Sequence, residues 1–448
     1  MQKKNIGNHS RFATVALLLL STAVILSCRP QSESGDTAAT ESLDDPGAIF
    51  TTVQAQKSFE SIQPPLHNFL QRRREALVQL EQIPSDRLRP VTLHARTTAE
   101  QRAGVRRIRI RGHQIISDSD YTYAGYSLGP GSPESALTII ASDIADTYVS
   151  QAALKGVRID SLGVSIVSRP DSVPPAVRIV YPHNLLYTIY VKSPATDEQL
   201  EELRLLTEQR SPIFNLVSTR QVISSDIDYQ PTPKDLTAEA PYQPGLREYL
   251  KYKRIAVLWR QNRGTEARPE RPDNSDTSPV RTPAVQPQPD RLHVEVDPAS
   301  GVRRLHIRHF NLLHDNPPYL AGNDLGPSAH EHQLGVLTSC ITHITEIQAA
   351  SREITLDSLA VSIEGTLDPR AGRPGFEDVP PGLHKIHYTV HVRSPHTREE
   401  IVALRDAVEA VCPIYNLILS EQKIEGRIVR ENPEARRLHP QFHYHYRD

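Results

Sequence analysis

An internal repeat constrains this chain more than any other feature of its sequence. Residues 104–143 align with residues 301–340 without a gap at an offset of 197, and 15 of the 40 pairs are identical. Two later hexapeptides, 211–216 and 412–417, match as well. A self-match at a fixed offset is the signature of a duplicated architecture. The sequence therefore predicts two copies of one domain within a single chain.

The two copies differ at two positions where chemistry would depend on a thiol. Cys340 in the second copy aligns with Asp143 in the first, and Cys412 aligns with Ser211. The chain has three cysteines in all, and Cys28 is the third. Because the first copy lacks both thiols, the sequence predicts one working site in a two-lobed scaffold.

The N-terminus has the pattern of an export signal. Three basic residues flank the start of an apolar stretch of 14 residues, 13–26, whereas a comfortable membrane span needs about 20. The stretch leads into Ile-Leu-Ser-Cys at 25–28, which resembles the lipobox of bacterial lipoproteins; an ordinary secretory signal with a chance cysteine is the alternative. We therefore expect a signal peptide over 1–27 and lipidation at Cys28. A lipid with more than one acyl chain would anchor the protein stably.

Composition sets the remaining boundaries. Residues 28–55 are mostly polar and predict a solvated tether. The first copy then covers 56–240 and the second 241–448. Within the second copy, residues 263–290 hold six prolines and almost no apolar residues, which predicts a disordered insertion.

Both copies show the same order of predicted elements, namely a helix, a β-hairpin, a long helix, two strands and a further helix. In the first copy these are expected at 66–80, 91–95 with 105–111, 134–155, 161–167 with 178–191, and 197–210. In the second copy they are expected at 246–259, 292–296 with 302–308, 331–351, 358–364 with 384–392, and 398–411. Strands that come in pairs predict an α+β fold with antiparallel sheets and long central helices, not a parallel sheet.

The residues alone leave three interpretations of Cys340 and Cys412 open. The two lie 72 residues apart, the first in an apolar helix and the second just before Pro413. They could form a structural disulfide, which is common in oxidising compartments. They could also be two unrelated buried thiols, or a redox-active pair. A peroxide-reducing thiol must react as the thiolate, and a nearby cation favours that form.

Charged residues near the long helix are candidates for activating such a thiol. Arg308 and Arg111 lie on strands before a Gly-Pro turn and could reach the start of the long helix, or could simply be solvated. Glu331 lies nine residues before Cys340, roughly 13.5 Å along a helix, so it could orient an arginine without touching the thiol. Its alternative role is that of an acid favoured at a helix start. His343 could share the face of Cys340, although a lone helical histidine is more often a packed or surface residue.

A series of short motifs extends through nearly all of the second copy. It contains the stretch 314–328 with its Pro-Pro and Gly-Pro pairs, then Glu331 and Cys340, and finally Cys-Pro-Ile-Tyr-Asn-Leu at 412–417. This combination resembles the OsmC/Ohr family, the osmotically inducible and organic hydroperoxide resistance proteins. Ala329 stands where that family usually has proline. The first copy resembles the same family in a degenerate form without the thiols.

The resemblance implies a mechanism and an assembly. Members of the family are typically thiol-dependent, peroxiredoxin-like hydroperoxide reductases that act as intertwined homodimers with sites at the subunit interface. Carried over, Cys340 would attack the peroxide and Cys412 would resolve the sulfenic acid as a disulfide. Glu331 would occupy the family's acidic position. Arg308 is the candidate activating arginine, with Arg111 as its equivalent from the other copy. The two copies would pack as a pseudo-dimer within one chain.

We therefore expect a lipid-anchored, monomeric thiol peroxidase of the bacterial cell envelope, facing the periplasm or carried by the outer membrane. Its substrate would be an organic or lipid hydroperoxide and its reductant an unknown dithiol, with no cofactor and no metal. A net charge of -2 provides no basic field for nucleic acid. The alternative is a non-catalytic envelope lipoprotein of the same fold, with a structural disulfide and a cleft that binds a ligand or partner.

Overall fold

The computed structural model describes residues 66–100, 104–171, 179–235, 245–262 and 292–431. All of them belong to one compact unit, Ile62–Asp448. The predicted signal peptide with Cys28, the tether and the insertion at 263–290 lie outside the described residues. Within the described ranges, no helix combines the length and the apolar character needed to cross a membrane.

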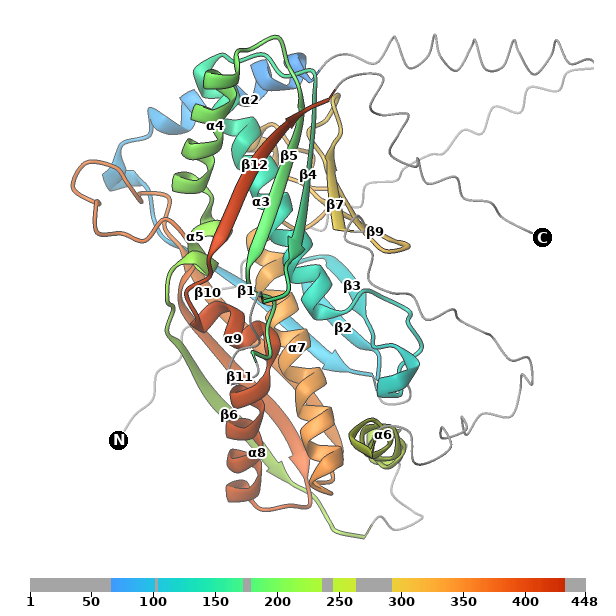
Figure 1. Ribbon diagram of the computed structural model, residues 1–448. Coiled ribbons are helices and arrows are strands. Elements are labelled where there is room, and N and C mark those ends of the chain that lie inside the picture. The colour runs from blue at the N-terminus through green and yellow to red at the C-terminus, as the bar shows by residue number, and fades with distance from the viewer. Residues whose placement is uncertain (1–65, 101–103, 172–178, 236–244, 263–291, 432–448) are drawn as a thin grey trace, which may run out of the picture. The chain divides into compact units, whose positions relative to one another are not determined.

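Two series of elements make up the described chain (Figure 1). The first consists of α2 (His67–Glu81), η1 (Ser85–Arg87), β1 (Val91–Ala99), β2 (Arg106–Ile110), β3 (His113–Ser117), η2 (Tyr121–Tyr123), α3 (Ser132–Lys155), β4 (Ser161–Ser168), β5 (Leu185–Lys192), α4 (Asp197–Arg210), α5 (Pro212–Ser218) and β6 (Ile223–Pro231). The second consists of α6 (Gly245–Asn262), β7 (Leu292–Val296), β8 (Arg303–Ile307), β9 (Phe310–His314), η4 (Pro318–Leu320), α7 (Ala329–Ser351), β10 (Ser358–Leu367), β11 (His384–Ser394), α8 (Arg398–Val411), α9 (Pro413–Leu419) and β12 (Ile424–Arg430). Apart from η1, the order of elements is the same in both.

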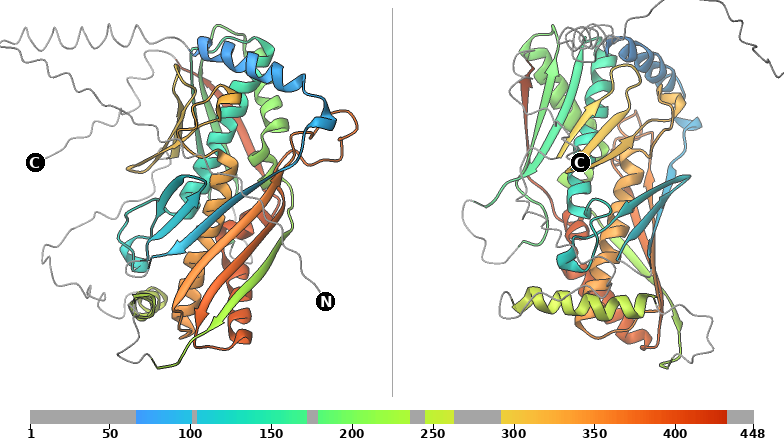
Figure 2. Two further views of the ribbon diagram at one scale, coloured as in Figure 1. Left: turned by 180° about the vertical axis from the view of Figure 1, so that it is seen from behind. Right: turned by 90° about the vertical axis from the view of Figure 1, so that its right-hand side faces the viewer.

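The strands form two six-stranded sheets, each of which combines strands from both series. One has the order β3-β2-β1-β10-β11-β6 and the other β12-β5-β4-β7-β8-β9. Figure 2 (left) shows the blue β1 beside the orange strands of the second series. Neighbours are antiparallel except for the pairs β11–β6 and β12–β5, which are parallel. The predicted α+β class with antiparallel-rich sheets is confirmed.

Several short elements were outside the sequence prediction. The hairpins gain a third strand, β3 or β9, and each series ends in a short helix and an edge strand, β6 or β12. Residues of β6 alternate between half-buried and exposed, so this strand lacks the buried apolar face that marks a strand in sequence. Its parallel partner also comes from the other series, which no local pattern can indicate.

The long helices α3 and α7 lie in the core. They pack against each other, and α7 also packs on β1, β2 and β10, while α3 packs on β4, β7 and β8. Both helices are buried around most of their circumference, as expected for helices that are apolar on all sides. Gly335 allows α7 to approach β2 closely, because a Cβ atom there would lie 2.6 Å from Cγ2 of Ile108. Each hairpin therefore rests on the long helix of the other series.

Candidate functional site

Cys340 and Cys412 meet in the core of the second series. Cys340 lies on α7, and Cys412 lies between α8 and α9, where it ends one helix and begins the next. Both side chains are buried and neither is in a disulfide. The two side chains are neighbours, and each affects the pKa of the other, with the Cys412 thiol as donor toward the Cys340 sulfur. The two thiols are therefore neighbours in the fold.

The environment makes the two thiols chemically different. Burial raises the pKa of Cys340, but hydrogen bonds from Cys412 and the backbone N–H of Ile414, together with the nearby Arg106 guanidinium, lower that pKa overall. Burial and the adjacent Cys340 sulfur raise the pKa of Cys412 well above its usual range. Cys340 is thus suited to be the thiolate, and Cys412 to stay protonated.

Arg106 is a site residue that the sequence prediction does not include. β2 places its buried side chain against α7, where Nε donates to Ser339 Oγ at 3.2 Å and Nη1 donates to His343 Nδ1 at 3.2 Å. Its remaining side-chain hydrogen bonds also go to neutral acceptors: Gly104 O, Ser117 Oγ and Ser119 Oγ. One signal was present in the sequence, since Arg106 and Arg303 are an identical pair within the repeat.

Arg111, and not Arg308, contacts Glu331. Arg111 Nε donates to Glu331 Oε1 at 2.5 Å and Nη2 to Oε2 at 3.1 Å, while Nη1 and Nη2 reach the Asp324 carboxylate at 2.8 and 2.9 Å. Hydrogen bonds to Asp324 and Glu331 raise the pKa of Arg111. Arg308 instead pairs with Glu134 of the first series at 3.1 Å. The arginine at Glu331 is therefore Arg111 and not Arg308, the first candidate, because each hairpin packs on the long helix of the other series.

Glu331 takes both of the roles that its position allows. It lies in the first turn of α7 and accepts a hydrogen bond from the backbone N–H of Ser328 at 2.9 Å, as the acidic member of a capping box. It also orients Arg111. The helix α7 begins at Ala329, so it forms without the proline that the family usually has at this position.

The corresponding place in the first series contains Asp143 and Ser211. Ser211 Oγ donates to Asp143 Oδ2 at 2.5 Å, and the backbone N–H of Ile213 donates to the same oxygen at 2.9 Å. Ile213 corresponds to Ile414, which donates to Cys340 in the second series. The fold therefore directs two hydrogen-bond donors at the side chain of Asp143 in the first series and at that of Cys340 in the second. Donors that serve a carboxylate in one copy can serve a thiolate in the other.

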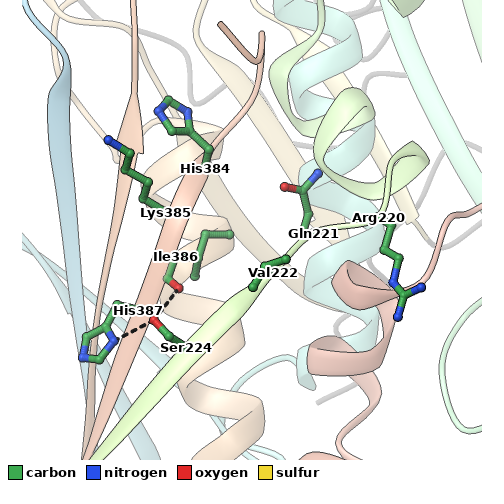
Figure 3. A pocket seen from close by; sticks show the side chains of 8 residues that line it. All are labelled: Arg220, Gln221, Val222, Ser224, His384, Lys385, Ile386 and His387. Carbon is green, nitrogen blue, oxygen red and sulfur yellow. Dashed lines mark hydrogen bonds between the residues drawn. The ribbon is translucent and has the colours of Figure 1, made fainter. Parts of the chain in front are cut away.

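An open surface pocket of about 690 Å³ lies where β6 and β11 begin (Figure 3). It is lined by Arg220, Gln221, Val222, Ser224, His384, Lys385, Ile386 and His387. Lys385 and His387 point to one side of β11, whereas His384 and Ile386 point to the other. The basic groups do not converge, and none of the predicted site residues lines this pocket.

Comparison with known proteins identifies the segment that contains both thiols. Residues 322–426 match the family model of OsmC-like protein. This part of the chain is similar to the OsmC-like family. The resemblance read from the sequence is confirmed for the second copy. The OsmC-like segment includes Glu331, Cys340 and Cys412, whereas Arg106 and Arg111 come from the first series, outside it.

Solved structures include an OsmC-like protein from Mycoplasma pneumoniae that is similar to this chain. The two are 22% identical, the match covers 30% of this chain and 90% of the other, and the TM-score is 0.24. No curated protein matches the chain.

Proposed function

We propose that this protein is a thiol-dependent hydroperoxide reductase, with Cys340 as the peroxidatic and Cys412 as the resolving cysteine. The observation that carries the proposal is that two buried thiols, both outside any disulfide, are neighbours on α7 and at the start of α9. Similarity of the second copy to the OsmC-like family, whose members are often hydroperoxide reductases, supports it.

The proposed reaction has two steps on the protein. The Cys340 thiolate attacks one oxygen of the peroxide, so that an S–O bond forms, the O–O bond breaks and the departing alkoxide takes a proton to become an alcohol. Cys412 then attacks the sulfur of the sulfenic acid, an S–S bond forms and water leaves. An external dithiol reduces the disulfide by exchange. Because the two thiols are neighbours, the disulfide can form with little movement.

We infer that one chain replaces the two subunits of an intertwined dimer. Each sheet joins strands of both series through the pairs β1–β10 and β4–β7. Arg111 of the first series holds Glu331 of the second, and Arg106 of the first lies near Cys340 of the second. The first copy would thus supply arginines and packing surface to a site that contains only the second copy's thiols, and the protein would act as a monomer.

The proposed setting is the bacterial cell envelope, with the chain anchored by lipid on Cys28. The short apolar stretch and the lipobox-like motif support this location. An anchored enzyme would meet lipid hydroperoxides at the membrane surface, and we propose these and other organic hydroperoxides as substrates. The reductant would be a dithiol of the same compartment.

Stopped-flow oxidation tests the proposed function. We expect the reduced protein to react with cumene hydroperoxide at least about 100-fold faster than free cysteine at the same pH, because the site stabilises the thiolate and the developing charge. Protein whose thiols have been alkylated beforehand is the control. A rate equal to that of free cysteine would contradict the enzyme and favour the non-catalytic alternative.

The two equivalent arginines provide a matched pair of variants. Arg111→Gln is expected to slow the reaction with peroxide by about tenfold, because it leaves Glu331 and Asp324 unpaired at the start of α7. Arg308→Gln makes the same change against Glu134 in the first series and should stay within about twofold of the native rate. Equal slowing by both variants would show that the effect comes from general destabilisation.

A further inference from the structure

A half-buried carboxylate on the long helix of the first series, Asp146, neutralises a strand arginine of the second series, Arg303. Asp146 lies three residues after Asp143 on α3 and accepts hydrogen bonds from Arg73 Nη2 of α2, at 3.0 Å to each oxygen. Arg303 of β8 forms a direct ion pair with the same carboxylate. Burial raises the pKa of Asp146, but Arg303 and Arg73 lower it overall, so the group is an anion.

His343 takes the place of Asp146 in the second series. Arg106 Nη1 lies 3.2 Å and Lys253 Nζ 3.3 Å from His343 Nδ1. Burial and the charges of Lys253 and Arg106 lower the pKa of His343 well below its usual range, so the ring is neutral and Nδ1 accepts. The carboxylate of this cluster, Glu346, comes three residues later on α7: its Oε2 lies 3.7 Å from His343 Nδ1 and pairs with Lys253 Nζ at 3.1 Å.

Other titratable groups face this cluster from the elements packed around it. They are Cys412 at the start of α9, Tyr249 of α6, Tyr123 of η2 and Asp118 after β3. Asp118 accepts backbone N–H groups of Ser119, Tyr126 and Leu128. In the ranges that the structure describes, no carboxylate lies within ion-pair distance of Arg106.

We propose that His343 is a positioning residue for the Cys340 thiolate: its hydrogen bond holds Arg106 next to Ser339, the neighbour of Cys340 on α7, and places a neutral ring against the guanidinium where the first series has a carboxylate. A carboxylate at this position would cancel much of the field that Arg106 exerts on the sulfur, and burial makes that field strong. The long helix of the first series, which has no thiol, has such a carboxylate, Asp146, beside Arg303, the arginine equivalent to Arg106. The importance of His343 for peroxide reduction rests on the proposed function, whereas its effect on thiol acidity does not.

Two nearly isosteric variants isolate the charge. We place His343→Asp and His343→Asn in a chain that also contains Cys28→Ser and Cys412→Ser, so that Cys340 is the only thiol. The pKa of Cys340 is read from thiolate absorbance during a pH titration and from the pH dependence of alkylation by iodoacetamide. We expect the Asp variant to titrate about one pH unit higher than the Asn variant, which should remain within about 0.3 unit of the parent.

A second pair of variants covers the outcome in which His343→Asp does not fold. Ser119 Oγ lies 3.3 Å from Arg106 Nη1 and 3.2 Å from His343 Nδ1, so Ser119→Asp introduces a carboxylate beside the same guanidinium nitrogen while His343 is kept, and Ser119→Asn is its neutral control. The same upward shift of the Cys340 pKa is expected only for Asp. Equal pKa values in the folded Asp and Asn variants would overturn the inference.

These measurements use no peroxide, so the two proposals fail separately. A shifted pKa in a protein that reduces no hydroperoxide would overturn the proposed function alone. Rapid peroxide reduction with an unchanged pKa in the Asp variants would overturn the role of His343 alone.

Discussion

Replacing Cys412 by serine is expected to reduce steady-state hydroperoxide turnover by more than about 100-fold, while the first oxidation of Cys340 continues. Serine retains a hydrogen-bond donor, as Ser211 does for Asp143 in the first series, so Cys340 should still ionise. It cannot form a disulfide, and the sulfenic acid should accumulate. Trapping with dimedone followed by mass spectrometry should show one adduct per chain, on Cys340.

Cys340→Ser is the paired control for this experiment. It removes the nucleophile, so neither turnover nor a dimedone adduct is expected, even though Cys412 is still present with its raised pKa. Normal turnover by the Cys412→Ser protein would rule out the resolving role. Substantial peroxide consumption by the Cys340→Ser protein would rule out the peroxidatic role.

Local patterns predict the main elements of this fold well. The two long helices were expected at 134–155 and 331–351 and are found at Ser132–Lys155 and Ala329–Ser351. Such helices are long, strongly apolar and bounded by Gly-Pro turns, which makes them readable from sequence. The strands β6 and β12 are not predicted because neither has a fully buried face, and because both lie at sheet edges and pair with strands of the other series.

The sequence predicts which thiols lie in the candidate site but not the charged groups around them. The alignment alone pairs Cys340 with Asp143 and points to the two thiols and Glu331. It does not reveal which arginine meets which helix, since that depends on how the hairpins cross between the series. Arg106 faces inward on β2, which contains other arginines close to it in sequence. Sequence alone therefore does not distinguish the buried cation from the solvated ones.

The largest effect on stability is expected from Asp146→Asn. The change leaves Arg73 and Arg303, both with side chains only 2% exposed, without their common carboxylate. Breaking a buried pair by removing one partner typically costs about 3–5 kcal/mol, because the charges that remain are buried and uncompensated. Asp146 is itself 22% exposed, so we expect a loss of about 3 kcal/mol in the free energy of unfolding, measured by chemical denaturation.

Asp324→Asn is the matched control, since it removes a carboxylate from Arg111 at the surface. Those side chains are 38% and 43% exposed, and surface pairs contribute about 0–1 kcal/mol.

The pH dependence of stability gives a second check on Asp146. The pKa of Asp146 is lower in the folded than in the unfolded protein. The stability that Asp146 contributes is therefore complete above its unfolded-state pKa of about 4, and it is lost as the pH falls through its folded-state pKa. The difference between native and Asp146→Asn protein should therefore shrink only in acid, and a constant difference would assign the loss to packing.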